Sequence, residues 1–150
     1  LKVEVNSREH FTELGYARVP FGVRSDWWSG EVDVTTFSID ELLGTKLRAL
    51  YQRRKGRDLF DIWHAFGAGG AAVDRVVSSL GRYLREEGRR VTRAAFEENL
   101  AGKLSDSRFR GDLSGLLRPG VDWDIDAAGA FVMTEILARL PGDAVRVETT

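Results

Sequence analysis

The sequence predicts an α+β protein, with a small piece of sheet at its front and a helical bundle behind it. Two observations support this fold class. Alternating and β-branched runs are confined to the first 37 residues. From Ser38 onward, apolar residues recur at helical spacing in segments separated by glycine and proline. We therefore expect two parts, residues 1–37 carrying the sheet and residues 38–150 forming the helical domain.

Two stretches of the front part have the pattern of strands. Leu1–Asn6 alternates in period two and places its three aliphatic residues on one face, as a strand with one buried side does. Glu31–Phe37 is rich in β-branched residues. The intervening Gly15–Gly30 contains proline and glycine and is interpreted as loops, with room for one short strand. We expect the sheet to be incomplete, with further strands upstream of Leu1.

The helical part opens on a capping box, Ser38–Glu41, in which the Ser and Glu side chains can satisfy free amides at a helix start. The first helix is predicted over Ile39–Lys55, with Gly56 ending or bending it. A second helix is predicted over Arg57–Phe66, stopped by a glycine-rich run. The later helices are predicted over Ala71–Glu87, Thr92–Leu104, Phe109–Leu117 and Ala127–Leu140.

Composition excludes several classes of function. The chain has no cysteine, so disulfides, thiolate catalysis and thiolate-bound zinc are excluded. Its net charge of -1 gives no global attraction to nucleic acid. No apolar run is long enough for a membrane span, and the residues show no basic-then-apolar pattern typical of a signal peptide, so we expect a cytoplasmic protein with no membrane partner. Because the chain starts with Leu1, we expect it to begin inside a longer gene product or to follow a processing step.

One short stretch concentrates positive charge. Six of the twelve residues in Lys46–Arg57 are basic and none is acidic. On a helix, Lys46, Ala49 and Arg53 share one face, which Arg57 would continue if the helix ran on. The same helix can bury leucines on the adjoining stripe, so it could present Lys46 and Arg53 to an anion.

Two carboxylates follow directly. Asp58 and Asp61 are three residues apart and therefore lie on one face of the second predicted helix. Carboxylates beside several cations have two uses. They can fix the basic side chains by ion pairing, which is the commoner case, or they can take part in chemistry on a phosphorylated substrate.

The stretch Leu42–Asp61 resembles the signature of the AbiEii/AbiGii toxin family. That signature is a helical Lys, then Ala-Leu, then Arg, then Arg-Asp, an aromatic or aliphatic pair, and Asp. Its counterparts here are Lys46, Ala49-Leu50, Arg53 and Arg57-Asp58-Leu59-Phe60-Asp61. The opening Lys2–Asn6 is similar to the family's strand, in which a charged residue is flanked by aliphatic ones. Residues 1–66 support the resemblance, and the rest agrees only in being helical.

The resemblance implies a nucleotidyltransferase fold of the polymerase-β type, here as part of the sheet followed by the helical bundle. It implies the toxin of a toxin–antitoxin or abortive-infection phage-defence system, with a cognate antitoxin as partner. Such enzymes bind a nucleoside triphosphate with Mg²⁺ and transfer a nucleotide to RNA, in characterised relatives to the acceptor end of tRNA. Magnesium takes only one or two carboxylates plus phosphate oxygens, so a small acidic set suffices.

The resemblance also implies roles for single residues. The candidates for the reaction centre are Lys46, which would contact the triphosphate, and Asp58 or Asp61, which would complete the site. Three would support phosphates or RNA: Arg53, Arg57 and Lys2. Glu4 would be a further carboxylate near the metal, although Asp is the more usual residue in this role across the wider fold.

The sequence departs from the family in one respect. Members carry a Gly-Gly/Ser motif and an Asp-x-Asp on an early strand, and neither is found before Lys2. Two metal ligands are then missing, so we expect the isolated chain to be inactive. An alternative stays open, in which the basic helix belongs to a non-catalytic module that binds RNA or a partner protein.

Three other features are given structural interpretations. Asp122–Asp126 is interpreted as a turn whose acids cap the next helix. His64 is interpreted as a satisfied or surface histidine, because His10 is the only other one and lies far away in the sequence. The pair Trp27-Trp28 is interpreted as core or loop packing, in preference to stacking on a base.

Overall fold

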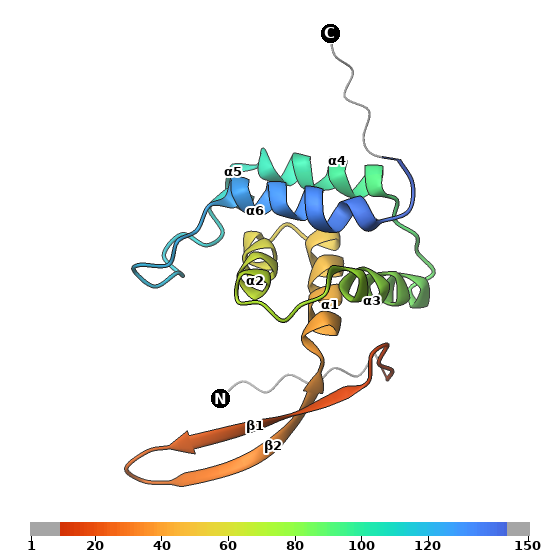
Figure 1. Ribbon diagram of the computed structural model, residues 1–150. Helices are drawn as coiled ribbons and strands as arrows, with labels where there is room; N and C mark the ends of the chain where they lie inside the picture. The colour runs from red at the N-terminus through yellow and green to blue at the C-terminus, as the bar shows by residue number, and fades with distance from the viewer. Residues whose placement is uncertain (1–9, 144–150) are drawn as a thin grey trace. The chain divides into compact units, whose positions relative to one another are not determined.

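The computed structural model describes residues 10–143, and the chain divides into two compact units, Leu1–Ser38 and Ile39–Thr150. Within the described residues, the first unit contains two strands and the second contains six α-helices (Figure 1). The predicted α+β fold, with a sheet before a helical bundle, is confirmed. The strand predicted over Leu1–Asn6 lies outside the described residues.

The first unit is a β-hairpin. β1 (Tyr16–Arg24) pairs antiparallel with β2 (Ser29–Phe37) along its whole length. β2 confirms the predicted strand over Glu31–Phe37, but the interpretation of Gly15–Gly30 as mainly loops is wrong. The strand β1 tolerates Pro20 because a proline, which lacks an amide N–H, can sit in an edge strand.

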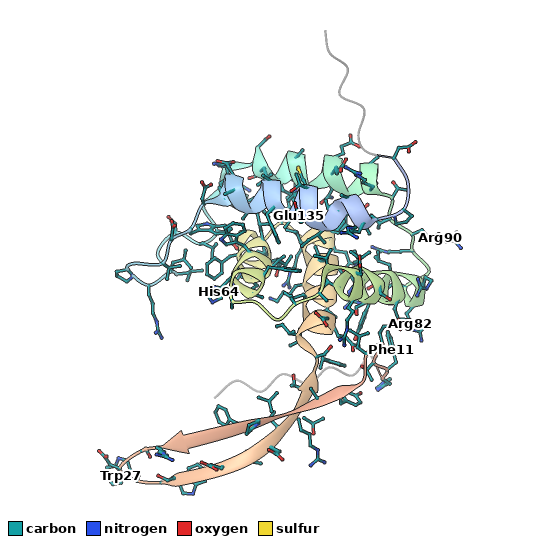
Figure 2. All side chains as sticks on the ribbon, viewed as in Figure 1. Phe11, Trp27, His64, Arg82, Arg90 and Glu135 are labelled. Carbon is teal, nitrogen blue, oxygen red and sulfur yellow. The ribbon has the colours of Figure 1, made fainter. Side chains whose placement is uncertain are left out.

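One face of the hairpin is apolar. Directly paired residues lie on the same face of a sheet, and Val19 faces Val34 while Phe21 faces Val32. All four of these side chains are exposed within the part of the chain that the structure describes. At the hairpin tip Trp27 is 95% exposed, so the expectation that this tryptophan packs is wrong (Figure 2).

The second unit begins with a sharp corner between two helices. α1 (Ile39–Gln52) stops before the predicted end at Lys55, and α2 (Gly56–Gly67) starts on Gly56. A Cβ at Gly56 would lie 2.4 Å from the carbonyl oxygen of Phe109. The glycine is therefore the point at which α2 packs against another backbone, and it begins a helix where the sequence predicted the end of one.

The end of α1 is satisfied from outside the helix. α1 has no basic residue in its last turn. The ammonium of Lys103, which is 3% exposed, donates to the carbonyl oxygens of Leu50 and, at 2.9 Å, Tyr51. A positive charge at a helix C-terminus pairs favourably with the free carbonyls there. Lys103 therefore caps α1.

The following helices agree with prediction over most of their length. α3 (Val73–Glu86) and α4 (Arg93–Leu104) lie within the predicted ranges. The helix predicted over Phe109–Leu117 is wrong, because α5 (Ser107–Arg110) is only 4 residues long and turns follow it. Gly115 in these turns has φ +77°, a conformation that ends helices.

The last predicted helix, Ala127–Leu140, is built from three pieces. α6 (Ile125–Phe131) continues into a π-helical turn, η1 (Val132–Ile136), and a 3₁₀ turn, η2 (Leu137–Arg139). Asp124 caps α6 by accepting from the amides of Asp126 at 2.9 Å and Ala127 at 3.0 Å. The capping role predicted for the acids of residues 122–126 is confirmed at Asp124.

The helices of the second unit form two layers. Figure 1 shows α4 and α6 lying side by side, with α1, α2 and α3 forming the other layer. The core between the layers consists of fully buried side chains from every long helix, among them Leu47, Leu59, Leu80, Phe96, Leu100 and Val132. α1 and α3 approach closely at Gly44, where a Cβ would lie 2.6 Å from Cβ of Ser79. None of the described helices is both long and apolar enough to cross a bilayer.

Candidate functional site

The corner between α1 and α2 brings together four of the residues singled out in the sequence. The Lys46 Nζ lies 2.6 Å from Oδ2 of Asp61 and 3.5 Å from Oδ1 of Asp58. The Arg53 guanidinium donates through Nε and Nη2 to the two carboxylate oxygens of Asp58, each at 2.7 Å. We call these four residues the corner cluster.

The members of the corner cluster differ in exposure. The side chain of Asp58 has no exposed surface, whereas those of Lys46 and Asp61 are 37% and 42% exposed. Asp58 therefore forms part of the wall of the site. The Lys46 amine, the Asp61 carboxylate and the Arg53 side chain, which is 55% exposed, are the parts of the cluster that a dissolved molecule can reach.

Local sequence explains this placement. The leucines of α1, including Leu43, Leu47 and Leu50, are buried, which leaves Lys46 on a different stripe of the helix. Asp58 lies in the first turn of α2, where the free amides favour negative charge. The corner is short, so the end of α1 and the start of α2 hold Arg53 and Asp58 side by side.

The pair of Arg53 and Asp58 is the stronger of the two interactions around Asp58. A guanidinium that donates two parallel bonds to one carboxylate forms a strong, directional pair. The hydrogen bond to Asp58 is the main cause that raises the pKa of Arg53 above its ordinary value, against an opposing effect of burial. Arg53 is thus committed to Asp58 in this structure.

Arg57 does not join the corner cluster. Its Nε lies 3.4 Å from Oδ2 of Asp112, and its backbone amide donates to the same oxygen at 3.2 Å. The chain turns at Gly56, so Arg57 begins a new helix and does not continue the face of Lys46. The condition under which Arg57 would continue the face of Lys46 and Arg53, a first helix that runs on, is therefore not met.

The other cations of the basic stretch are also paired. Arg48 lies 3.0 Å from Glu87, Arg54 2.9 Å from Asp106, and Lys55 3.8 Å from Asp112. Each of the six basic residues in Lys46–Arg57 thus has a carboxylate within 4 Å. The stretch is an ion-paired corner. Asp106 and Asp112 could not be predicted as its partners, because they lie more than 50 residues away along the chain.

The described carboxylates do not fit a divalent cation as they stand. Both oxygens of Asp58 accept from Arg53, and Asp61 is paired with Lys46. Within residues 10–143, no group of three His, Cys, Asp or Glu side chains could hold a metal ion. Mg²⁺ requires carboxylate oxygens that are free to coordinate. Glu4 and Lys2, predicted for the metal and for phosphates, lie outside the described residues.

His64 has a packing partner on its own helix. Its ring stacks on Phe60 with centroids 5.5 Å apart and planes 9° from parallel. Phe60 in turn meets Trp123 edge to face. Figure 2 shows His64 on α2. This exposed, stacked histidine agrees with the surface interpretation made from the sequence.

The corner cluster offers an accessible cation whose position is set by two carboxylates. A substrate anion that approached Lys46 would compete with Asp61, which is partly exposed and can be rehydrated. It would not need to displace Arg53 from Asp58. The arrangement suits the reversible binding of a phosphate-sized anion by one lysine.

The comparisons with known proteins bear on the family to which the chain belongs. A family model described as "Nucleotidyl transferase AbiEii toxin, Type IV TA system" matches residues 1–130. The matched range contains the whole corner cluster. No match was found among curated proteins or among solved structures.

Proposed function

Because the chain belongs to the AbiEii family of nucleotidyl transferase toxins of type IV toxin–antitoxin systems, we propose that its corner cluster forms part of a nucleotidyltransferase active site. The family implies a nucleotide substrate and an antitoxin partner. We further propose that the acceptor is RNA, with the acceptor end of tRNA as the first candidate. The observation that supports an active site at the corner cluster is the partly exposed Lys46 amine, held between the Asp58 and Asp61 carboxylates.

In this proposal Lys46 binds the triphosphate. A lysine about 4 Å from a phosphate charge gains roughly 4 kcal/mol of attraction at an effective dielectric near 20, before desolvation is subtracted. That suffices to orient a triphosphate but not to bind it alone. Asp61 keeps its ion pair with Lys46 until the substrate binds, and its carboxylate is then hydrated by solvent. Asp58 stays hydrogen-bonded to Arg53 throughout.

Two further properties stay predictions. Magnesium dependence is expected from the family resemblance, since Mg²⁺ spreads the charge that develops on transferring phosphates. Its ligands would have to include residues other than Asp58 and Asp61 as they are paired here. That the chain on its own is inactive also stays a prediction, since no Asp-x-Asp stands among residues 1–45.

A transfer assay tests the proposal. The natural gene product that contains this chain is incubated with each radiolabelled nucleoside triphosphate, Mg²⁺ and total tRNA. We expect label to appear in the RNA and to be lost in Lys46→Ala. Lys55→Ala is the matched control, because Lys55 is a partly exposed lysine on the same corner that pairs with Asp112 at 3.8 Å. Labelling that survives Lys46→Ala and matches that of the control would rule out the role of Lys46.

The alternative, a non-catalytic RNA-binding module, has less support. It requires the basic stretch to be free for phosphates, but each of its six cations has a carboxylate within 4 Å. Its signature would be an RNA affinity of the chain that falls steeply with salt. Such binding, together with absent transfer, would favour the module over the enzyme.

A further inference from the structure

The geometry of Arg53 departs from the role that the family resemblance gives it. That role is contact with phosphates or RNA. In the structure both oxygens of Asp58 accept from the Arg53 guanidinium at 2.7 Å. The pair of N–H donors that could bind a phosphate is therefore already bound to a carboxylate. These two bonds occupy the Nε and Nη2 edge of the guanidinium, so without displacing Asp58 a phosphate could reach only the remaining Nη hydrogens.

The surroundings of Asp58 make this bond hard to exchange. The Asp58 side chain has no exposed surface, so a released carboxylate would stay buried without its main partner. Removing one partner from a buried ion pair is far more costly than removing one from an exposed pair. A substrate phosphate would therefore have to compete with a bound, buried anion, whereas at Lys46 it competes only with the partly exposed Asp61.

The backbone reinforces the same arrangement. Arg53 is tied to the end of α1 by its amide, which donates to the Ala49 carbonyl at 2.9 Å. Asp58 is tied to the start of α2 by its amide, which donates to Lys55 at 3.1 Å. The pair of Arg53 and Asp58 thus closes the corner from one helix to the other, directly beside Lys46.

From this geometry we infer that Arg53 is a positioning residue: it holds Asp58 in the orientation that aligns Lys46, and it does not contact the substrate. The inference rests on the proposed nucleotidyl transfer for its catalytic consequence, and on the structure alone for its effect on Lys46. An arginine is required because the lysine ammonium lacks the planar fork that reaches both carboxylate oxygens.

The first experiment observes the NMR signal of the Lys46 ammonium group directly and needs no enzymatic activity. The ¹H–¹⁵N spectrum of lysine ammonium groups is recorded for the wild-type chain, Arg53→Ala, Arg53→Lys and Arg54→Ala. The chain has only four lysines, so the Lys46 signal can be assigned by its loss in Lys46→Ala. We expect both Arg53 variants to shift or broaden the Lys46 signal. Arg54, a neighbour that pairs with Asp106 and is 69% exposed, is the matched control and should leave it unchanged.

The second experiment separates three roles by kinetics, in the natural gene product and at a temperature at which circular dichroism shows every variant to be folded. Because Lys46 orients the triphosphate without binding it alone, a positioning role predicts that Arg53→Lys lowers kcat by roughly 10- to 100-fold, as expected when reacting groups are displaced by about 1 Å, with a smaller rise in KM for the triphosphate. A rise in KM with unchanged kcat would indicate substrate contact and overturn the inference. A lowered melting temperature with unchanged kcat and KM would indicate a purely structural role and overturn it as well.

The two experiments test the proposed function and the positioning role of Arg53 separately. A wild-type product that transfers no nucleotide would overturn the proposed function, and the ammonium spectra would still decide whether Arg53 positions Lys46. A Lys46 signal that is identical in wild type and in both Arg53 variants would overturn the positioning role, whatever the transfer assay shows.

Discussion

The carboxylate of Asp58 has no exposed surface and accepts from Arg53 at both oxygens, with Lys46 3.5 Å away. Among single residues, the removal of Asp58 or of Arg53 should therefore destabilise the fold. Asp58→Ala would leave two cations without their shared partner at the α1–α2 corner. We expect the free energy of unfolding to fall by about 3 kcal/mol, the lower end for a broken buried pair, since both cations are partly exposed.

Urea unfolding measures this change, and Asp61→Asn is the control. Asp61 is 42% exposed, and a surface ion pair contributes only about 0–1 kcal/mol. Asp58→Ala and Asp61→Asn should therefore differ by about 2 kcal/mol or more. Equal losses in the two variants would show that the Asp58 carboxylate is not the structural anchor of the corner.

Lys103 predicts a dependence of stability on pH. Burial, followed by the nearby charge of Arg54, lowers the pKa of Lys103 from 10.5 to about 8. The folded chain then loses this proton at lower pH than the unfolded chain does. Stability rises with pH wherever the unfolded state binds more protons than the folded state. The contribution of Lys103 to the free energy of unfolding should therefore increase as the pH rises from about 8 to about 10.5.

The comparison with Lys103→Met isolates this contribution. The difference in unfolding free energy between wild type and the variant should grow in favour of the wild type across this range and be constant below it. A difference that stays flat from pH 7 to pH 11, or that shrinks, would contradict the assignment of a depressed lysine.

Part of the candidate site could be predicted from single residues. The spacing of Lys46, Asp58 and Asp61 was enough to place them together, because a helical lysine and the acids of the next helix meet when the connecting turn is short. The partner of Arg53 could not be predicted. Its side chain could turn to a substrate or to Asp58, and only the folded corner decides between them.

At the scale of elements, two glycines give opposite predictions. A Cβ at Gly56 would lie 2.4 Å from the Phe109 carbonyl oxygen, so Gly56→Ala must push α2 away from α5. We expect a loss of about 1–3 kcal/mol, the usual cost of overpacking. Gly102 lies in α4 with no atom within 4 Å of its Cβ position, so Gly102→Ala should gain about 0.5–1 kcal/mol.

Thermal unfolding of the two variants measures both signs in one experiment. A Gly56→Ala chain as stable as the wild type would mean that α2 and α5 are less closely packed than described. A Gly102→Ala chain that is destabilised would contradict the open surroundings of that position in α4.

The boundaries of helices and strands could be predicted from sequence patterns in some places and not in others. Apolar spacing predicted α3 and α4 closely, because each has a continuous buried stripe. It failed at Gly56, which the pattern treated as a stop, since the close approach of Phe109 is not visible in the sequence. It failed again at β1, where Pro20 and Gly22 obscured an alternation that runs from Ala17 to Val23.

At the scale of the whole molecule, the core belongs to one unit. Every residue of the buried cluster, from Leu43 to Leu140, lies in the helical unit, Ile39–Thr150. The hairpin by contrast exposes its apolar face, and an isolated hairpin is marginally stable in water. The core of the helical unit should therefore not depend on the hairpin.

Deletion of residues 1–38 tests this directly. We expect the remaining chain to unfold cooperatively on heating, with a melting temperature within about 5 °C of the full chain, which corresponds to a change of about 1 kcal/mol in a domain of this size. A deleted chain without cooperative unfolding would show that the helical unit needs the hairpin to fold.

The family membership and the fold class follow from short patterns, but the activity depends on how the corner cluster works as a unit. The measurement that tests this most directly is nucleotide transfer to RNA by the natural gene product carrying Lys46→Ala, Asp58→Asn or both. Residues that act together are strongly non-additive, so the double variant should be no slower than the slower single variant. Losses that multiply in the double variant, or single variants as fast as the wild type, would contradict the account that Lys46 and Asp58 act as one unit.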